Sequence, residues 1–138
     1  MGARNRQFGL FIPVFLACLL ASANGRTEEN CHKTASIQNE MNLCAKADAK
    51  KADAELSAVY AKLMAKASPQ GQTRLHAAEE AWLVYRKRQC EFDSFGTSAG
   101  SIHPMIVSEC YRFYAIQHAE DLRRQLDCDE GNLSCAKQ

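Results

Sequence analysis

Apolar side chains recur every three or four residues from Ser36 to Lys66, the pattern of a helix with one buried face. The residues that share this face are Cys44, Asp48, Ala52, Leu56, Val59 and Leu63. Nine of the 23 residues from 45 to 67 are alanine, the strongest helix former, and neither glycine nor proline occurs from 34 to 67. The pattern therefore predicts one long amphipathic helix over Ser36–Lys66, with Ser36 as its N-cap.

A second helix follows after a short connection. Ser68-Pro69 suits the cap and the first position of a helix, so this helix is expected to begin between residues 69 and 75 and to end near Phe92. Its two adjoining stripes contain Leu75, Ala78, Trp82, Tyr85 and Gln89, and then Trp82, Arg86 and Cys90. Because the connection is short, the first two helices should lie antiparallel.

A third helix is expected from Pro104 to Leu126, since proline is favoured in the first turn of a helix. One broad arc of it contains Val107, Cys110, Tyr111, Tyr114, Ala115, His118 and Leu122. No stretch alternates β-branched or aromatic residues with polar ones, so no sheet is expected. The predicted fold is all-α, a three-helix antiparallel bundle-like domain stapled by disulfides.

The register of the first two helices predicts a specific ion pair. Counted outward from a turn near Pro69, Asp53 lies opposite Tyr85 and Arg86. We therefore expect an Asp53–Arg86 pair across the interface. Its role would be structural rather than catalytic.

The N-terminal residues read as an export signal rather than as part of the fold. Arg4 and Arg6 precede an apolar run that ends in Ala21-Ser22-Ala23, the small residues that a signal peptidase recognises. We expect a Sec-type signal peptide over residues 1–23, cleaved after Ala23, and a single domain over 24–138. Cys18 lacks the small-residue box of a lipid-modified cysteine, so we assign it to the leader. The apolar run is too short for a membrane span.

The remaining six cysteines form an even set, which in an exported chain indicates three disulfides. Cys128 and Cys135 enclose a short C-terminal loop and are expected to pair. The expected long-range pairing is Cys31–Cys90 with Cys44–Cys110. Counting helix levels favours instead Cys44–Cys90 with Cys31–Cys110, and the sequence does not choose between the two sets.

The composition argues against several functional classes. Without the leader, 15 Lys and Arg residues face 16 Asp and Glu residues, a formal charge of −1 that does not indicate nucleic acid as a partner. No G-x-S-x-G, no C-x-x-C-H and no pair of histidines at chelating spacing is present. We therefore expect no catalytic residues, cofactor or metal site, and we interpret the protein as a non-enzyme.

One segment is the best candidate for a partner surface. Residues 92–103 contain two glycines and three serines, so they are expected to form a loop between the second and third helices. Phe95 and Ile102 in this loop look exposed, and exposed apolar residues on a braced loop favour protein binding. The candidate surface consists of Phe95, Gly100, Ser101, Ile102 and His103.

Several short motifs together resemble a known family. They are MNLC at 41–44, AD-x-EL at 52–56, Tyr60, AWL-x-YR at 81–86, Cys90, Gly100-Ser101 and Cys110. Together they are similar to the N-terminal domain of LprI-type lysozyme inhibitors, over about Cys31 to Leu126. The resemblance implies an all-helical, disulfide-bonded domain of the bacterial periplasm or cell surface. It implies no inhibitory residues, because no motif of the family marks them.

Two functional hypotheses follow from these observations. The first is an exported envelope protein that binds lysozyme or another envelope protein stoichiometrically. The second is a structural or ligand-binding periplasmic protein without inhibitory activity. The sequence does not specify the oligomeric state.

Overall fold

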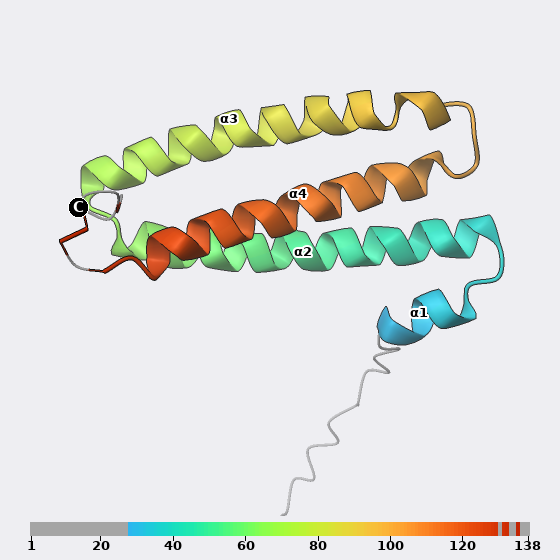
Figure 1. Ribbon diagram of the computed structural model, residues 1–138, viewed down its shortest axis with the longest axis horizontal. Coiled ribbons are helices and arrows are strands. Elements are labelled where there is room, and N and C mark those ends of the chain that lie inside the picture. The colour runs from blue at the N-terminus through green and yellow to red at the C-terminus, as the bar shows by residue number, and fades with distance from the viewer. Residues whose placement is uncertain (1–27, 130, 133–134, 136–138) are drawn as a thin grey trace, which may run out of the picture.

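The computed structural model describes residues 28–129, 131–132 and 135, and within these ranges the fold is all-α with no strand. The expected signal peptide and its cleavage site after Ala23 lie outside the described residues. Three long helices run side by side with alternating direction, and a short helix folds back under the start of the first long one (Figure 1). The elements are α1 (Glu28–Thr34), α2 (Gln38–Lys66), α3 (Pro69–Asp93), the 3₁₀ turn η1 (Phe95–Thr97) and α4 (His103–Leu126).

The long-helix boundaries agree with the pattern to within two residues. Helix α2 begins at Gln38 rather than Ser36, and Ser36 is not its cap. The Glu40 carboxylate instead accepts the backbone N–H groups of Ser36, at 2.8 Å, and of Ile37. These two hydrogen bonds lower the pKa of Glu40 below its ordinary 4.5. Ser68 caps α3 as expected, because its hydroxyl accepts the N–H of Gly71.

The core lies between α2 and α4. Its buried members are Ala52, Leu56, Val59, Leu63, Ala115, Ala119 and Leu122. Alanines on both helices leave little bulk between the two backbones, which allows α2 and α4 to pack closely along their length. The apolar face predicted for the first helix is therefore the face that meets α4.

Helix α3 packs less intimately than α2 and α4 do. Only Arg86 and Cys90 are buried on it, while Leu75 and Trp82 rest against the edge of the core. Ala78 and Tyr85, which the predicted stripe placed inside, are exposed. Figure 1 shows α3 standing apart above the α2–α4 pair.

The pairing of the four cysteines outside the C-terminal loop differs from the prediction. Cys31 pairs with Cys44, and Cys90 pairs with Cys110, each with Cα atoms 5.7 Å apart. The expected Cys31–Cys90 with Cys44–Cys110 is wrong, and so is the alternative from helix levels. The pairing differs from the expectation because residues 28–34 form a helix, α1, that packs on the start of α2 and brings Cys31 beside Cys44.

The C-terminal bridge is the expected Cys128–Cys135, which closes a separation of seven residues. All six cysteines assigned to disulfides are therefore paired.

Among the described helices, none combines the length and the apolar character that a membrane span requires.

Candidate functional site

The connection between α3 and α4 forms a well-ordered end of the bundle, which we call the distal pole (residues 90–107). Successive backbone hydrogen bonds run through it, from Thr97 N–H to Ser94 O, Ser98 N–H to Phe95 O and Gly100 N–H to Thr97 O. The Ser94 side chain is buried and donates to the Cys90 carbonyl at 2.7 Å. The loop is therefore a series of hydrogen-bonded turns with a defined backbone conformation.

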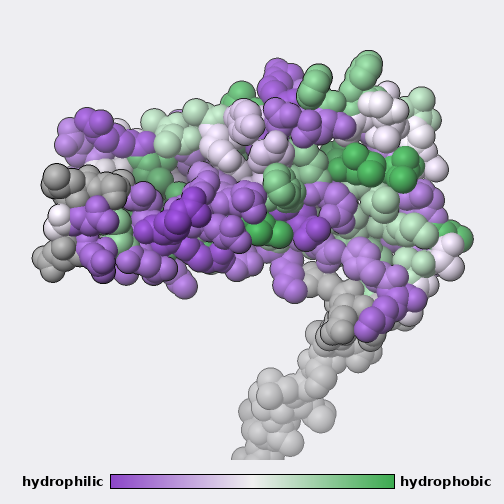
Figure 2. All heavy atoms as spheres, in the orientation of Figure 1, coloured by the Kyte–Doolittle hydropathy of each residue, from purple (hydrophilic) through white to green (hydrophobic). Residues whose placement is uncertain are grey.

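Large apolar side chains are exposed at this pole. Phe92 is 77% exposed, Phe95 is 76% exposed and Ile102 is 37% exposed. Figure 2 shows green, hydrophobic residues concentrated at this end of the molecule, whereas the opposite end is mostly purple. Exposed apolar side chains of this size make the pole a candidate interaction surface.

The residues predicted for the partner surface all lie at this pole. Phe95 starts η1, and His103 begins α4, where its Nδ1 lies 3.1 Å from Thr97 Oγ1. The Ser101 carbonyl accepts a hydrogen bond from the Asn42 side chain, which ties the loop to the start of α2. Gly100 has room for a Cβ, with ordinary contacts of 3.4 Å and beyond, so close packing does not require a glycine there.

A hollow of about 390 Å³ opens beside the exposed phenylalanine. Its lining combines apolar and polar groups, namely Cys90, Glu91, Ser94, Phe95, Ser98, His103, Val107 and Tyr111. The size and mixed lining suit one side chain of a protein partner. The sequence did not predict the hollow, because three of its lining residues, His103, Val107 and Tyr111, come from α4, and the hydrophobic pattern does not fix the rotation of α4 about its own axis.

The Cys90–Cys110 disulfide braces the pole from below. It joins the last turns of α3 to the second turn of α4, so the connection between them is anchored at both ends. A surface that is ordered before binding loses less conformational entropy when it binds. The geometry therefore suits recognition of a protein partner by a rigid protrusion.

A buried arginine organises the middle of α3. Arg86 Nη1 lies 2.5 Å from Asp53 Oδ1, so the ion pair expected from the register is present. The guanidinium is also stacked between two rings, 4.7 Å from the centroid of Trp82 and 4.9 Å from that of Tyr111. Cation–π contacts at such distances are favourable in a desolvated site.

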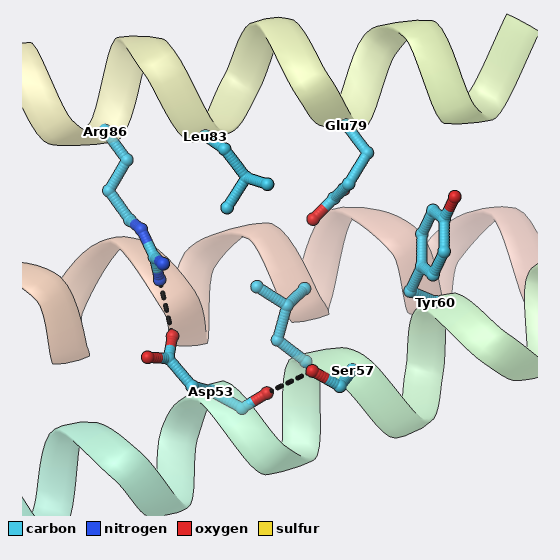
Figure 3. A pocket seen from close by; sticks show the side chains of 7 residues that line it. Asp53, Ser57, Tyr60, Glu79, Leu83 and Arg86 are labelled. Carbon is cyan, nitrogen blue, oxygen red and sulfur yellow. Dashed lines mark hydrogen bonds and ion pairs between the residues drawn. The ribbon is translucent and has the colours of Figure 1, made fainter.

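A second hollow, which we call the α2–α3 groove, lies along this ion pair. It has a volume of about 320 Å³ and is lined by Asp53, Leu56, Ser57, Tyr60, Glu79, Leu83 and Arg86. In Figure 3, Leu83, Glu79 and Arg86 project from α3 into the space above α2. The register of the two helices predicted the ion pair, whereas no pattern in the sequence predicted the groove.

One wall of the groove is tied to α4 by a mostly buried polar pair. Glu79 Oε2 lies 2.8 Å from His118 Nε2, and the His118 ring stacks on Trp82 at 4.0 Å between centroids. His118 is therefore a satisfied interior histidine rather than a metal ligand. Burial, followed by the carboxylates of Glu79 and Glu80, raises the pKa of Tyr60 on the facing helix.

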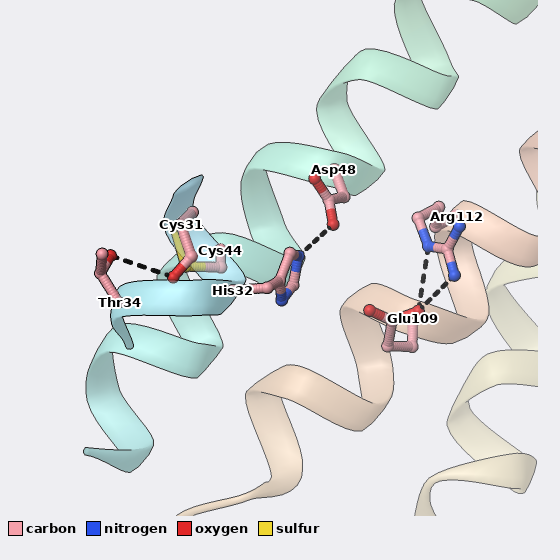
Figure 4. A network of polar contacts seen from close by, with 7 residues as sticks. All are labelled: Cys31, His32, Thr34, Cys44, Asp48, Glu109 and Arg112. Atoms are coloured by element: carbon pink, nitrogen blue, oxygen red, sulfur yellow. Dashed lines mark hydrogen bonds and ion pairs between the residues drawn. A yellow bond between two sulfur atoms is a disulfide. The ribbon is translucent and has the colours of Figure 1, made fainter. Parts of the chain in front are cut away.

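The N-terminal helix is fastened by a separate contact group. His32 Nε2 lies 2.6 Å from Asp48 Oδ2, one helical turn beyond the Cys31–Cys44 bridge (Figure 4). The Glu109–Arg112 pair of α4 forms its own contact nearby. The disulfide and the His32–Asp48 contact hold α1 against α2.

Nothing in the described part of the chain gathers three or more His, Cys, Asp or Glu side chains in a geometry that could hold a metal ion. The described residues offer a rigid pole with exposed apolar side chains and a groove of mixed polar and apolar lining. Both suit binding.

Comparisons with known proteins agree with this picture. A family model described as Lysozyme inhibitor LprI matches residues 30–122. An uncharacterised protein of Rhizobium meliloti (strain 1021) is 31% identical over 129 residues, which covers 83% of this chain and 92% of the relative. No solved structure matches the chain.

Proposed function

The chain belongs to the LprI lysozyme inhibitor family, and from this premise we propose that it is an exported envelope protein that binds and inhibits a lysozyme. The observation that carries the proposal is the extent of the family match. Residues 30–122 take in α2, α3, η1 and most of α4, so the similarity covers the whole bundle and not a single motif. Inhibition would be stoichiometric, one protein bound to one enzyme, without turnover.

The distal pole is the proposed contact surface. Phe95 and Ile102 are exposed there on a loop whose backbone is already hydrogen-bonded, and the hollow beside them can receive a side chain of the partner. Binding energy at protein interfaces is concentrated in a few such apolar anchors. A rigid pole also limits the entropy lost on association.

Export is supported by the three disulfides. Disulfides persist in oxidising compartments and are rare in the cytosol, so three of them in a small domain suit the periplasm or the cell surface. The leader expected over residues 1–23 would direct the chain there. In this proposed location the protein would meet a lysozyme that attacks the cell wall.

The small net charge of the protein limits the contribution of long-range electrostatics to binding. With a formal charge near zero, long-range steering of a charged enzyme contributes little, and affinity would come from close apolar contact. We therefore expect inhibition to depend only weakly on ionic strength.

A lytic assay tests the proposal. Purified protein with its disulfides formed is added at micromolar concentration to lysozymes of several structural classes acting on bacterial cell walls. We expect at least one class to lose activity, with complete inhibition approached near one equivalent. If none of the enzymes is inhibited, the protein is a structural or ligand-binding envelope protein and the proposal fails.

A further inference from the structure

Thr97 determines which nitrogen of the neutral His103 ring carries the proton. The Thr97 hydroxyl donates to the Ser94 carbonyl at 2.8 Å, and His103 Nδ1 lies 3.1 Å from the same hydroxyl oxygen. A hydroxyl has one proton and a carbonyl has none, so the contact with the ring needs a proton on Nδ1. In the neutral ring Nε2 is therefore unprotonated and can only accept a hydrogen bond.

His103 lines the hollow at the distal pole, and no described residue bonds to its Nε2. Other polar groups of the lining are already engaged. The buried Ser94 hydroxyl donates to the Cys90 carbonyl, and the Glu91 carboxylate is paired with cations of its own helix. Nε2 is thus an acceptor of the hollow that the described part of the protein leaves open.

The charges around the hollow favour a neutral occupant. Glu91 is the acidic residue of the lining, and it lies 2.9 Å from Arg88 and 4.0 Å from Lys87. A cationic side chain would therefore meet two positive charges beside one negative charge. An ionised carboxylate would meet the lone pair of His103 Nε2 instead of a donor. A neutral group that donates a hydrogen bond avoids both conflicts.

The rest of the lining favours an aromatic occupant. Phe95 and Tyr111 contribute rings, and Val107 and the bridged Cys90 contribute further apolar surface. The hollow, of about 390 Å³, has room for a large side chain. Aromatic side chains pack favourably against other rings, whereas a small polar side chain would leave these walls uncovered.

We propose that the hollow of the distal pole receives a tyrosine or tryptophan side chain of the protein that the pole binds, and that its O–H or N–H donates to His103 Nε2. These two side chains combine a large apolar body with one donor. They are also the commonest anchors of protein interfaces. The inference rests on the proposed function only in naming the partner.

The protonation of His103 is tested in the unaltered, disulfide-bonded protein. Long-range ¹H–¹⁵N spectra of the imidazoles are recorded at pH 8, where histidine rings are ordinarily neutral. We expect His103 to carry its proton on Nδ1 and none on Nε2. A proton on Nε2 would overturn the inference, because the hollow would then offer a donor.

A peptide titration tests the occupant without any lysozyme. The probe is N-acetyl-Gly-Tyr-Gly-amide, and its matched control carries phenylalanine, which keeps the ring and removes the hydroxyl. Binding at pH 8 is followed by ¹H–¹⁵N chemical shifts of the labelled protein. We expect shifts confined to the hollow and an affinity about fivefold higher for the tyrosine peptide, as for one neutral hydrogen bond. Equal affinities, or shifts elsewhere, would contradict the proposal.

Two variants assign the preference to His103. His103→Asn keeps a side-chain N–H for Thr97 but removes Nε2, so the fivefold preference for tyrosine should disappear while binding of the phenylalanine peptide changes less than twofold. His76→Asn makes the same replacement at an exposed position of α3 outside the hollow and should retain the preference. A preference that persists in His103→Asn would overturn the inference.

The lytic assay separates this inference from the proposed function. If a lysozyme is inhibited, His103→Asn should raise the inhibition constant about fivefold. An unchanged constant would exclude the hollow from the interface and overturn the inference. If no lysozyme is inhibited but the tyrosine peptide is still preferred, the proposed function fails and the hollow remains a site for an aromatic side chain of another partner.

Discussion

Arg86 is the residue on which the position of α3 most depends. Its side chain is only 9% exposed and lies between two aromatic rings, while its partner Asp53 is 43% exposed. The buried Nε has no hydrogen-bond partner among the described residues. The guanidinium is therefore stabilised by one carboxylate and by the two rings. Loss of that carboxylate should lower the free energy of unfolding.

Asp53→Asn is expected to destabilise the protein by about 1–3 kcal/mol, because it leaves a buried guanidinium without its counter-charge. The free energy of unfolding in urea measures the effect. Asp121→Asn provides the control, since Asp121 is 56% exposed and pairs with Arg124 on the helix surface, where a change within about 0.5 kcal/mol is expected. Equal effects of the two substitutions would show that Arg86 does not rely on Asp53.

The sequence predicted part of this arrangement. Asp53 and Arg86 lie at similar distances from the turn near Pro69, so their meeting follows from helix length alone. Tyr111 and the Glu79–His118 pair could not be predicted in the same way. They depend on how α4 is rotated toward α3, which no local pattern specifies.

At the scale of the elements, the three long helices are not equivalent. Small residues line the α2–α4 interface, and Ala115 and Ala119 are fully or almost fully buried there. Helix α3 instead turns Trp82 and Arg86 toward the other two, and these bulky side chains keep its backbone further away. A count of apolar positions predicts three helices but not this difference in spacing, because it ignores the size of the residues at each interface.

Removal of the Cys90–Cys110 bridge should therefore loosen α3 first. The double substitution Cys90→Ser with Cys110→Ser is expected to reduce stability by about 3 kcal/mol, from the entropy of a loop of about 20 residues. Amide hydrogen exchange should accelerate in α3 more than in α2 or α4. The Cys128→Ser with Cys135→Ser pair is the control, since it should leave α3 exchange unchanged. Equal acceleration in all three helices would contradict this account.

At the scale of the molecule, the distal pole carries three exposed large apolar side chains, Phe92, Phe95 and Ile102. The glycine- and serine-rich composition of residues 92–103 predicted a loop there, and Phe95 and Ile102 were predicted to be exposed in it. The fixed shape of the loop was not predicted, because it comes from the particular series of backbone hydrogen bonds within the loop and from the contact between Asn42 and the Ser101 carbonyl. The bundle serves as a rigid support that presents this surface.

The inhibition constant of a Phe95→Ala, Ile102→Ala variant against a lysozyme that the unaltered protein inhibits tests this account most directly. Both side chains are substantially exposed, so their removal should leave the melting temperature nearly unchanged. As anchors of the interface, the two side chains should each contribute strongly to the binding free energy, so the inhibition constant should rise tenfold or more. Val84→Ala, which removes an exposed apolar side chain from the middle of α3, should not alter it. An unchanged inhibition constant in the pole variant would contradict the account.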